Sequence, residues 1–150
     1  MTHRRQRAVE LDWPAIDVGS GDQHDRSDGL PTVLLRHELS DGRWHIDWLT
    51  ARRAEPSQLF SLRLPCMLSD LAVGQRVPIT AMPDHRPVYL YYEGPLSDGR
   101  GCVTQVACGF VTKITKSAKG VNIHAFWHNS GQIVVCVTHN DEGLCMFRLE

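Results

Sequence analysis

Residues 33–48 have the sequence VLLRHELSDGRWHIDW, and this stretch indicates a β-hairpin. It begins with the apolar run 33–35, and over residues 44–48 large apolar residues alternate with polar ones. Between the two runs stands Ser40-Asp41-Gly42, a composition typical of tight turns. Because alternation with a period of two places successive side chains on opposite faces of a strand, the stretch predicts two antiparallel strands.

Similar patterns recur along the rest of the chain. Further runs that favour strands are residues 89–92, 121–128 and 133–137. Turn formers separate the runs at residues 97–99, 119–120, 129–131 and 141–143. Many short strands between such turns predict a mostly β protein, either a closed barrel or a sandwich. Residues 59–71, with Pro65 inside, are the one plausible helix.

The first 30 residues differ from the rest. They are polar and rich in turn formers over residues 19–29, so we expect residues 1–30 to form a flexible N-terminal tail, with Leu11, Trp13 and Ile16 able to dock on the body. The remaining residues, 31–150, are expected to form one domain, because 150 residues suit a single domain on length alone.

The composition limits the classes of function. The chain carries 16 basic and 17 acidic residues, which does not indicate a large non-specific nucleic-acid surface. Its five cysteines, an odd number without CxxC spacing, argue against a disulfide scaffold and against a thiolate zinc site. No apolar run reaches the roughly 18 residues that span a membrane, and no signal peptide is evident. We therefore expect a cytoplasmic protein with reduced cysteines and no membrane partner.

The hairpin carries a candidate metal site. His45 and Asp47 share one strand face, and the length of the turn decides which residue joins them. A three-residue loop places His37 opposite His45, whereas a two-residue loop places Glu38 there instead. Two imidazoles and a carboxylate suit Mn, Zn or Fe better than Mg or Ca. The alternative is an ordinary strand with a solvated polar face.

Residues 84–94, DHRPVYLYYEG, form a second stretch of interest. His85 could serve as a general acid or could hydrogen bond to a phosphate. Arg86 could bind phosphate oxygens through two hydrogen bonds, although strand alternation would turn it to the opposite face. Tyr89 and Tyr91 would then share a strand face. The alternative is a tyrosine-rich strand that fills a small barrel.

Together the two stretches resemble the 3′-phosphoesterase domain at the N-terminus of bacterial DNA ligase D. That family has a histidine that ends one strand, then an H-x-D-x-R strand, and later a D-H-x-x-x-Y-x-x-x-E-G stretch. The matching positions, within residues 33–103, are His37, His45, Asp47, Asp84, His85, Tyr89, Glu93 and Gly94.

The resemblance implies a compact small β-barrel with one or two short helices over residues 31–150. It also implies a Mn-dependent hydrolase of DNA repair that removes 3′-phosphates or 3′-ribonucleotides. Its partners would be DNA or RNA/DNA 3′ ends and possible DNA-repair proteins. The residues implied as ligands of Mn²⁺, or of another divalent transition metal, are His37, His45 and Asp47. His85 would contact the scissile phosphate, and Tyr89 would support it.

The chain departs from the family pattern at one charged position. Leu49 stands where the family has an arginine, so another residue must supply that charge if the activity is kept. The candidates for phosphate binding are Arg63, Arg86 and Arg100, with Arg76 as a further possibility. Two other functions stay open: an inactive barrel that binds nucleic-acid ends or a repair partner, and a metal-free barrel with an unrelated polar face.

Overall fold

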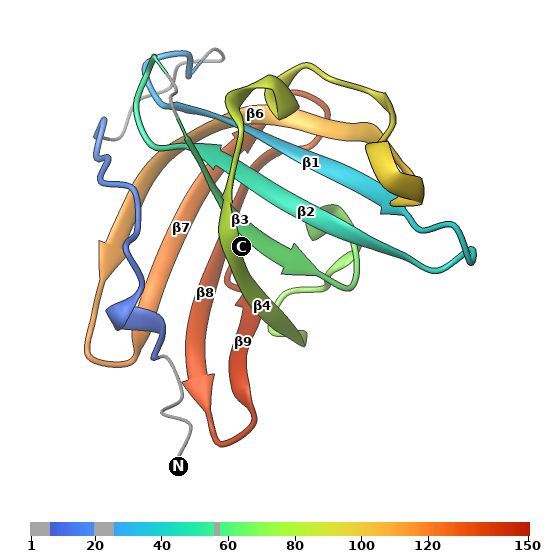
Figure 1. Ribbon diagram of the computed structural model, residues 1–150. Helices are drawn as coiled ribbons and strands as arrows, with labels where there is room; N and C mark the ends of the chain where they lie inside the picture. The colour runs from blue at the N-terminus through green and yellow to red at the C-terminus, as the bar shows by residue number, and fades with distance from the viewer. Residues whose placement is uncertain (1–6, 20–25, 56–57) are drawn as a thin grey trace.

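The computed structural model describes residues 7–19, 26–55 and 58–150 (Figure 1). Within these residues nine strands form one antiparallel sheet. The strands are β1 (Leu30–Glu38), β2 (Trp44–Ala51), β3 (Leu59–Leu64), β4 (Arg76–His85), β5 (Gly94–Pro95), β6 (Cys102–Lys116), β7 (Gly120–Trp127), β8 (Gly131–Asn140) and β9 (Gly143–Arg148). Single turns of 3₁₀ helix occur at η1 (Ala8–Glu10), η2 (Leu68–Asp70), η3 (Pro87–Leu90) and η4 (Ser97–Gly99).

The sheet curls round until its two sides meet. Its strand order is β1-β2-β3-β4-β9-β8-β7-β6-β5, and β1 also pairs with β6, which gives the ring-like arrangement seen in Figure 1. The expectation of a mostly β protein is therefore confirmed. Each long strand of the ring has a partner on both sides, so few backbone groups are left without a ladder hydrogen bond.

The helix expected over residues 59–71 is wrong for its first half, which forms β3. Phe60, Leu62 and Leu64 face the interior of the ring, while Leu59 is buried on the opposite face. Because both faces of β3 carry apolar residues, the period of two was hidden in the sequence. Only the short turn η2 follows.

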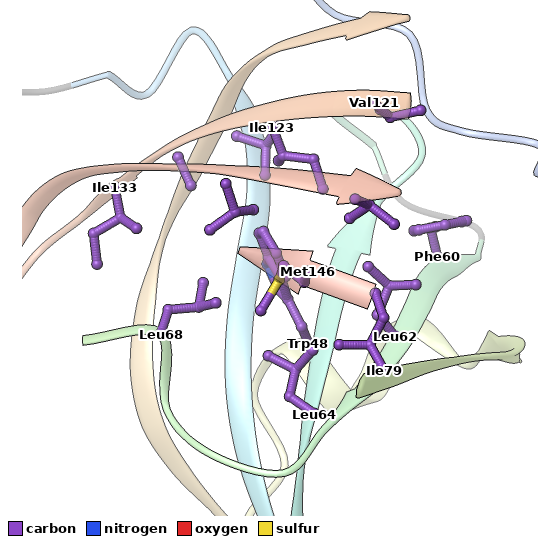
Figure 2. Close-up of a cluster of buried hydrophobic side chains, with 14 of the residues drawn as sticks. Trp48, Phe60, Leu62, Leu64, Leu68, Ile79, Val121, Ile123, Ile133 and Met146 are labelled. Carbon is purple, nitrogen blue, oxygen red and sulfur yellow. The ribbon is translucent and has the colours of Figure 1, made fainter. Parts of the chain in front are cut away.

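The interior of the ring holds the larger hydrophobic core (Figure 2). Trp48 of β2 and Trp127 of β7 meet there with ring centroids 6.0 Å apart, although β1 and β6 lie between these two strands in the ring. Met146 of β9 and Leu62 of β3 are 0 % and 2 % exposed in the same core. Burial of each such side chain stabilises the fold by about 1.5–3 kcal/mol, so this core is the main source of stability.

A second core lies on the outer face of β1, β2 and β3. Val33, Leu35 and Leu49 are buried there together with Leu90 of η3. The segment that carries η3, β5 and η4 thus packs across the outside of the hairpin, where Figure 1 shows it beside β1 and β2. This packing explains why residues 33–35 are apolar on both faces.

The turn between β1 and β2 has three residues. The backbone N–H of Leu39 donates to the carbonyl oxygen of Arg43 at 2.7 Å, so residues 40–42 form the loop. Gly42 has a positive φ of +90°, which allows the chain to turn back. His37 therefore lies opposite His45. The two-residue alternative, which would have placed Glu38 there, is wrong.

The N-terminal segment packs on the ring. Leu11 and Trp13 are buried in the main core, and the Trp13 ring lies 4.8 Å from that of Phe60. The docking expected for these residues is therefore confirmed, and Ala8 is buried in the same core. Residues 1–6 and 20–25 of the expected flexible tail lie outside the described residues.

All five cysteines are free thiols, and Cys102 is exposed. In the part of the chain that the structure describes, no helix is long and apolar enough to cross a membrane.

We predict that Trp13→Ala lowers the free energy of unfolding by about 3 kcal/mol, because a buried indole is lost from the core. The measurement is urea unfolding followed by circular dichroism. The matched control is Trp44→Ala: Trp44 is 43 % exposed, and the Arg36 guanidinium lies 4.5 Å from the centre of its ring, so a loss of about 0.5–1 kcal/mol is expected. Equal losses for the two variants would contradict a stabilising role of the N-terminal segment.

Candidate metal centre

Three side chains with metal-binding groups converge on the outer face of the β1–β2 hairpin. His37 comes from β1, and His45 and Asp47 come from β2. The Nδ1 atom of His37 lies 3.1 Å from Nε2 of His45, and that atom lies 3.3 Å from Oδ1 of Asp47. Two atoms that each lie about 2.1 Å from one ion are roughly 3.0–3.4 Å apart, so these spacings fit a shared divalent ion.

The ring of His37 is oriented by a backbone group. Its Nε2 atom lies 2.6 Å from the carbonyl oxygen of Arg100 and donates to it, which leaves the lone pair on Nδ1 to face His45. Metal-binding histidines almost always donate their second ring nitrogen to a carbonyl or carboxylate in this way. The contact also joins the hairpin to the segment that packs across it.

The environment of Asp47 fits a cation. Its side chain is 5 % exposed, and Oδ1 is buried without a hydrogen-bond partner among the described residues. Arg63 comes near, but its Nε atom is 3.6 Å away and lacks a hydrogen-bond partner as well. A buried carboxylate oxygen without a donor is costly unless a positive charge compensates it. The donor set and this orphaned oxygen together fit a divalent metal.

His45 is suited to the same role. Burial lowers the pKa of His45, although the adjacent Asp47 carboxylate opposes the shift. A lowered pKa favours neutral imidazole, which is the form that binds metal ions.

A cleft of about 430 Å³ opens beside these three residues. It brings together most of the residues singled out from the sequence, although they come from five different parts of the chain. The site residues that line it are His37, Asp47, Arg63, His85, Arg86, Tyr89 and Arg100. His45 reaches the site through its contacts with His37 and Asp47.

His85 reaches the cleft because β4 contains a bulge. Ser61 pairs with Met82, yet Leu59 pairs with His85, so β4 has one extra residue between these pairs. The bulge places His85 opposite Leu59, on the outer face that also carries the hairpin site. The Nδ1 atom of His85 lies 3.1 Å from the Pro83 carbonyl oxygen.

The prediction of a strand over residues 89–92 is wrong. Pro87 begins the 3₁₀ turn η3 instead, since proline lacks the N–H that a ladder needs and suits the first position of a helical turn. As a result Arg86 lines the same cleft as His85, not the opposite face. Tyr89 follows one turn later, with its ring edge-on to His85 at 5.9 Å.

The two acidic residues of the second stretch anchor it. Asp84 accepts two hydrogen bonds from Arg52, at 2.6 and 2.9 Å, and these bonds raise the pKa of Arg52. Glu93 accepts a hydrogen bond from the backbone N–H of Gln105 in β6, at 2.8 Å. Arg52 is a positioning residue that the sequence did not indicate, because nothing in the pattern pairs it with Asp84.

The arginines separate into two groups. Arg63 lies directly opposite Asp47 on β3, and Arg86 and Arg100 also line the cleft. Arg76 is elsewhere, with its guanidinium over the ring of Phe147 at 4.4 Å. Leu49, at the family's arginine position, is fully buried in the outer core. Arg63 is thus the charge nearest to the candidate ligands.

Comparisons with known proteins add no assignment. No family model matches the chain, and no curated protein matches it. The likeness to the ligase D 3′-phosphoesterase domain therefore stays a prediction carried by the motif residues.

We predict that His45→Ala weakens Mn²⁺ binding, measured by isothermal titration calorimetry, by about 100-fold or more, since even the loss of a supporting contact to a ligand costs about 10–100-fold. The matched control is His85→Ala, which removes an imidazole from the same cleft but outside the ligand set and should leave the affinity within a fewfold of the wild type. Equal weakening by both variants would contradict the assignment of ligands.

Proposed function

We propose that the protein is a metal-dependent phosphoesterase acting on 3′ ends of DNA, where it removes a 3′-phosphate or a 3′-ribonucleotide during DNA repair. The observation that carries the proposal is that two members of the His37, His45 and Asp47 triad, His37 and Asp47, line one cleft with three arginines and His85. We further propose that the ring-like sheet is a small β-barrel of the ligase D 3′-phosphoesterase type, and that the ion is Mn²⁺ or another divalent transition metal.

The triad would supply the electrophilic part of the reaction. A divalent ion bound there polarises a phosphoryl oxygen and lowers the pKa of a bound water. Asp47 and the two histidines would hold the ion and offset its charge, while Arg100 fixes the His37 ring through its carbonyl oxygen. The chain itself therefore orients the ligands before substrate arrives.

His85 would protonate the leaving group. Its Nδ1–H donates to the Pro83 carbonyl, so the imidazolium presents Nε2–H as its second donor. During hydrolysis the oxygen of water would bond to phosphorus as the bond from phosphorus to the 3′ oxygen breaks. The 3′ oxygen would take a proton from His85, and the proton that the water gives up to solvent would balance the one that His85 takes back. Tyr89 packs against the imidazole and keeps it in place.

The arginines would bind the non-bridging phosphate oxygens. Guanidinium groups match phosphate geometry and stay charged at neutral pH. Arg63 is the best replacement for the charge that Leu49 lacks, because it stands beside Asp47 on the neighbouring strand. Arg86 and Arg100 would approach the phosphate from the overlying segment.

The second candidate function is a catalytically inactive module that binds nucleic-acid ends or a repair partner. The burial of Leu49 favours it, since the missing charge has been replaced by core packing. Such a module would bind 3′-phosphorylated ends but would release no phosphate with any divalent metal.

We expect release of phosphate from a 3′-phosphorylated primer–template in Mn²⁺ but not in EDTA, and likewise trimming of a single 3′-ribonucleotide. His45→Ala and His85→Ala should each lower kcat/KM by about 100-fold or more, as loss of a ligand or of a general acid does. The assay is quantification of 3′-hydroxyl product on denaturing gels. Tight binding of the ends without product in any divalent metal would favour the inactive module.

Arg63→Ala should lower kcat/KM by about 10- to 100-fold, because one or two charge-assisted hydrogen bonds to phosphate are lost. Arg63→Lys should recover only part of this, since an ammonium cannot bind two oxygens in a fork. The matched control is Arg76→Ala, which removes an arginine far from the cleft and should leave kcat/KM unchanged. Equal effects of the two alanine variants would argue against a role of Arg63 in phosphate binding.

A further inference from the structure

A second cleft of about 450 Å³ adjoins the metal cleft. The residues that line both are Arg86, Tyr89, Leu96 and Arg100. A polymer with one group in the cleft beside His37 and Asp47 can therefore continue directly into the second cleft. We call this second space the adjoining cleft; its own walls include Val88, Tyr92, Pro95 and Ser97.

The lining of the adjoining cleft combines a flat apolar surface with positive charge. Tyr92, Pro95 and Leu96 supply the apolar surface, and Arg86 and Arg100 supply two guanidinium groups. No carboxylate is among the described residues that line it. Aromatic side chains next to arginines are the arrangement with which proteins hold the bases and the backbone of single-stranded nucleic acids.

The Tyr92 ring is held in a fixed orientation. Its hydroxyl donates to the carbonyl oxygen of Pro95, and the ring stands edge-on to Tyr89 with centroids 6.1 Å apart. Arg100 is held as well, by hydrogen bonds of 2.9 Å from Nε to the Ser97 carbonyl oxygen and from Nη2 to its hydroxyl. Rigid side chains lose little conformational entropy on binding, so these two residues are suited to ligand contact.

We propose that the adjoining cleft binds the nucleoside that carries the 3′-phosphate, with its base packed against Tyr92. The inference deepens the proposed function and rests on it. With the terminal phosphate at the triad, the attached sugar passes the shared residues Arg86 and Arg100, and the base enters the adjoining cleft. The enzyme would then recognise the last base of the strand without hydrogen bonds to its edge, so all four bases would be accepted.

The test compares two single-stranded oligonucleotides that both end in a 3′-phosphate. One carries a normal last nucleotide, and the other carries an abasic tetrahydrofuran in its place. Binding is measured by fluorescence anisotropy in EDTA, which prevents metal-dependent turnover. We expect the wild-type protein to bind the normal end roughly 5- to 150-fold more tightly, the range that one base stacked on an aromatic side chain contributes.

Two tyrosine variants locate the effect. Tyr92→Ala should abolish the preference for the normal end, while Tyr92→Phe should keep it because the ring remains. The matched control is Tyr91→Ala, since Tyr91 is 82 % exposed and lines neither cleft. If Tyr92→Ala fails to fold, Val88→Glu places a carboxylate at a half-exposed position of the same cleft and should weaken binding of the normal end selectively.

Equal binding of the two ends by the wild-type protein would overturn the inference, and so would a preference that persists in a folded Tyr92→Ala variant. Phosphate release in Mn²⁺ without any dependence on the base would leave the proposed function in place and remove the inference. Base-dependent binding without release of phosphate in any divalent metal would support the inference and contradict the proposed phosphoesterase activity.

Discussion

The packing of the η3–η4 segment on the outer face of β1, β2 and β3 is the interaction on which the rest of the site depends. Leu90 is buried in the outer core with Leu35 and Leu49, and this contact sets the segment over the hairpin. Gly101 permits the close approach, because a Cβ there would lie 2.0 Å from the Glu38 carbonyl oxygen. The consequence is a cleft with two walls: His37, Asp47 and Arg63 on the sheet, and Arg86, Tyr89 and Arg100 above it.

The largely buried polar cluster of His37, His45 and Asp47 destabilises the folded state, which indicates that the cluster has a function. Asp47 is almost fully buried beside two imidazoles, and one of its oxygens has no hydrogen-bond donor among the described residues. A buried carboxylate of this kind destabilises the folded state unless a positive charge lies close. Arg63 offsets part of the charge, and a bound divalent ion would offset the rest. The same two cations would face a phosphate in the cleft.

The architecture explains why position 49 carries an apolar residue. The position faces the outer core and is fully buried, so a charged side chain there would need a partner or a route to solvent. Arg63 is partly exposed on the neighbouring strand and opposite Asp47, where a guanidinium can reach the cleft without being buried. Arg63 thus places a positive charge beside Asp47 from the neighbouring strand.

The sequence alone determined the strand-rich fold, the hairpin and the residue types of the candidate metal ligands, because alternation and turn composition are local properties. It narrowed the hairpin to two registers, and the three-residue loop with His37 opposite His45 was one of them. Only the tertiary structure decided the rest. The alternation of side chains along a strand predicted that Arg86 and His85 lie on opposite faces. The bulge in β4 and the helical turn that begins at Pro87 interrupt this alternation, so both residues line one cleft. The position of Arg63 beside Asp47 and the hydrogen bonds of Arg52 to Asp84 both depend on contacts between segments far apart in the sequence. A local sequence pattern gives no information about such contacts.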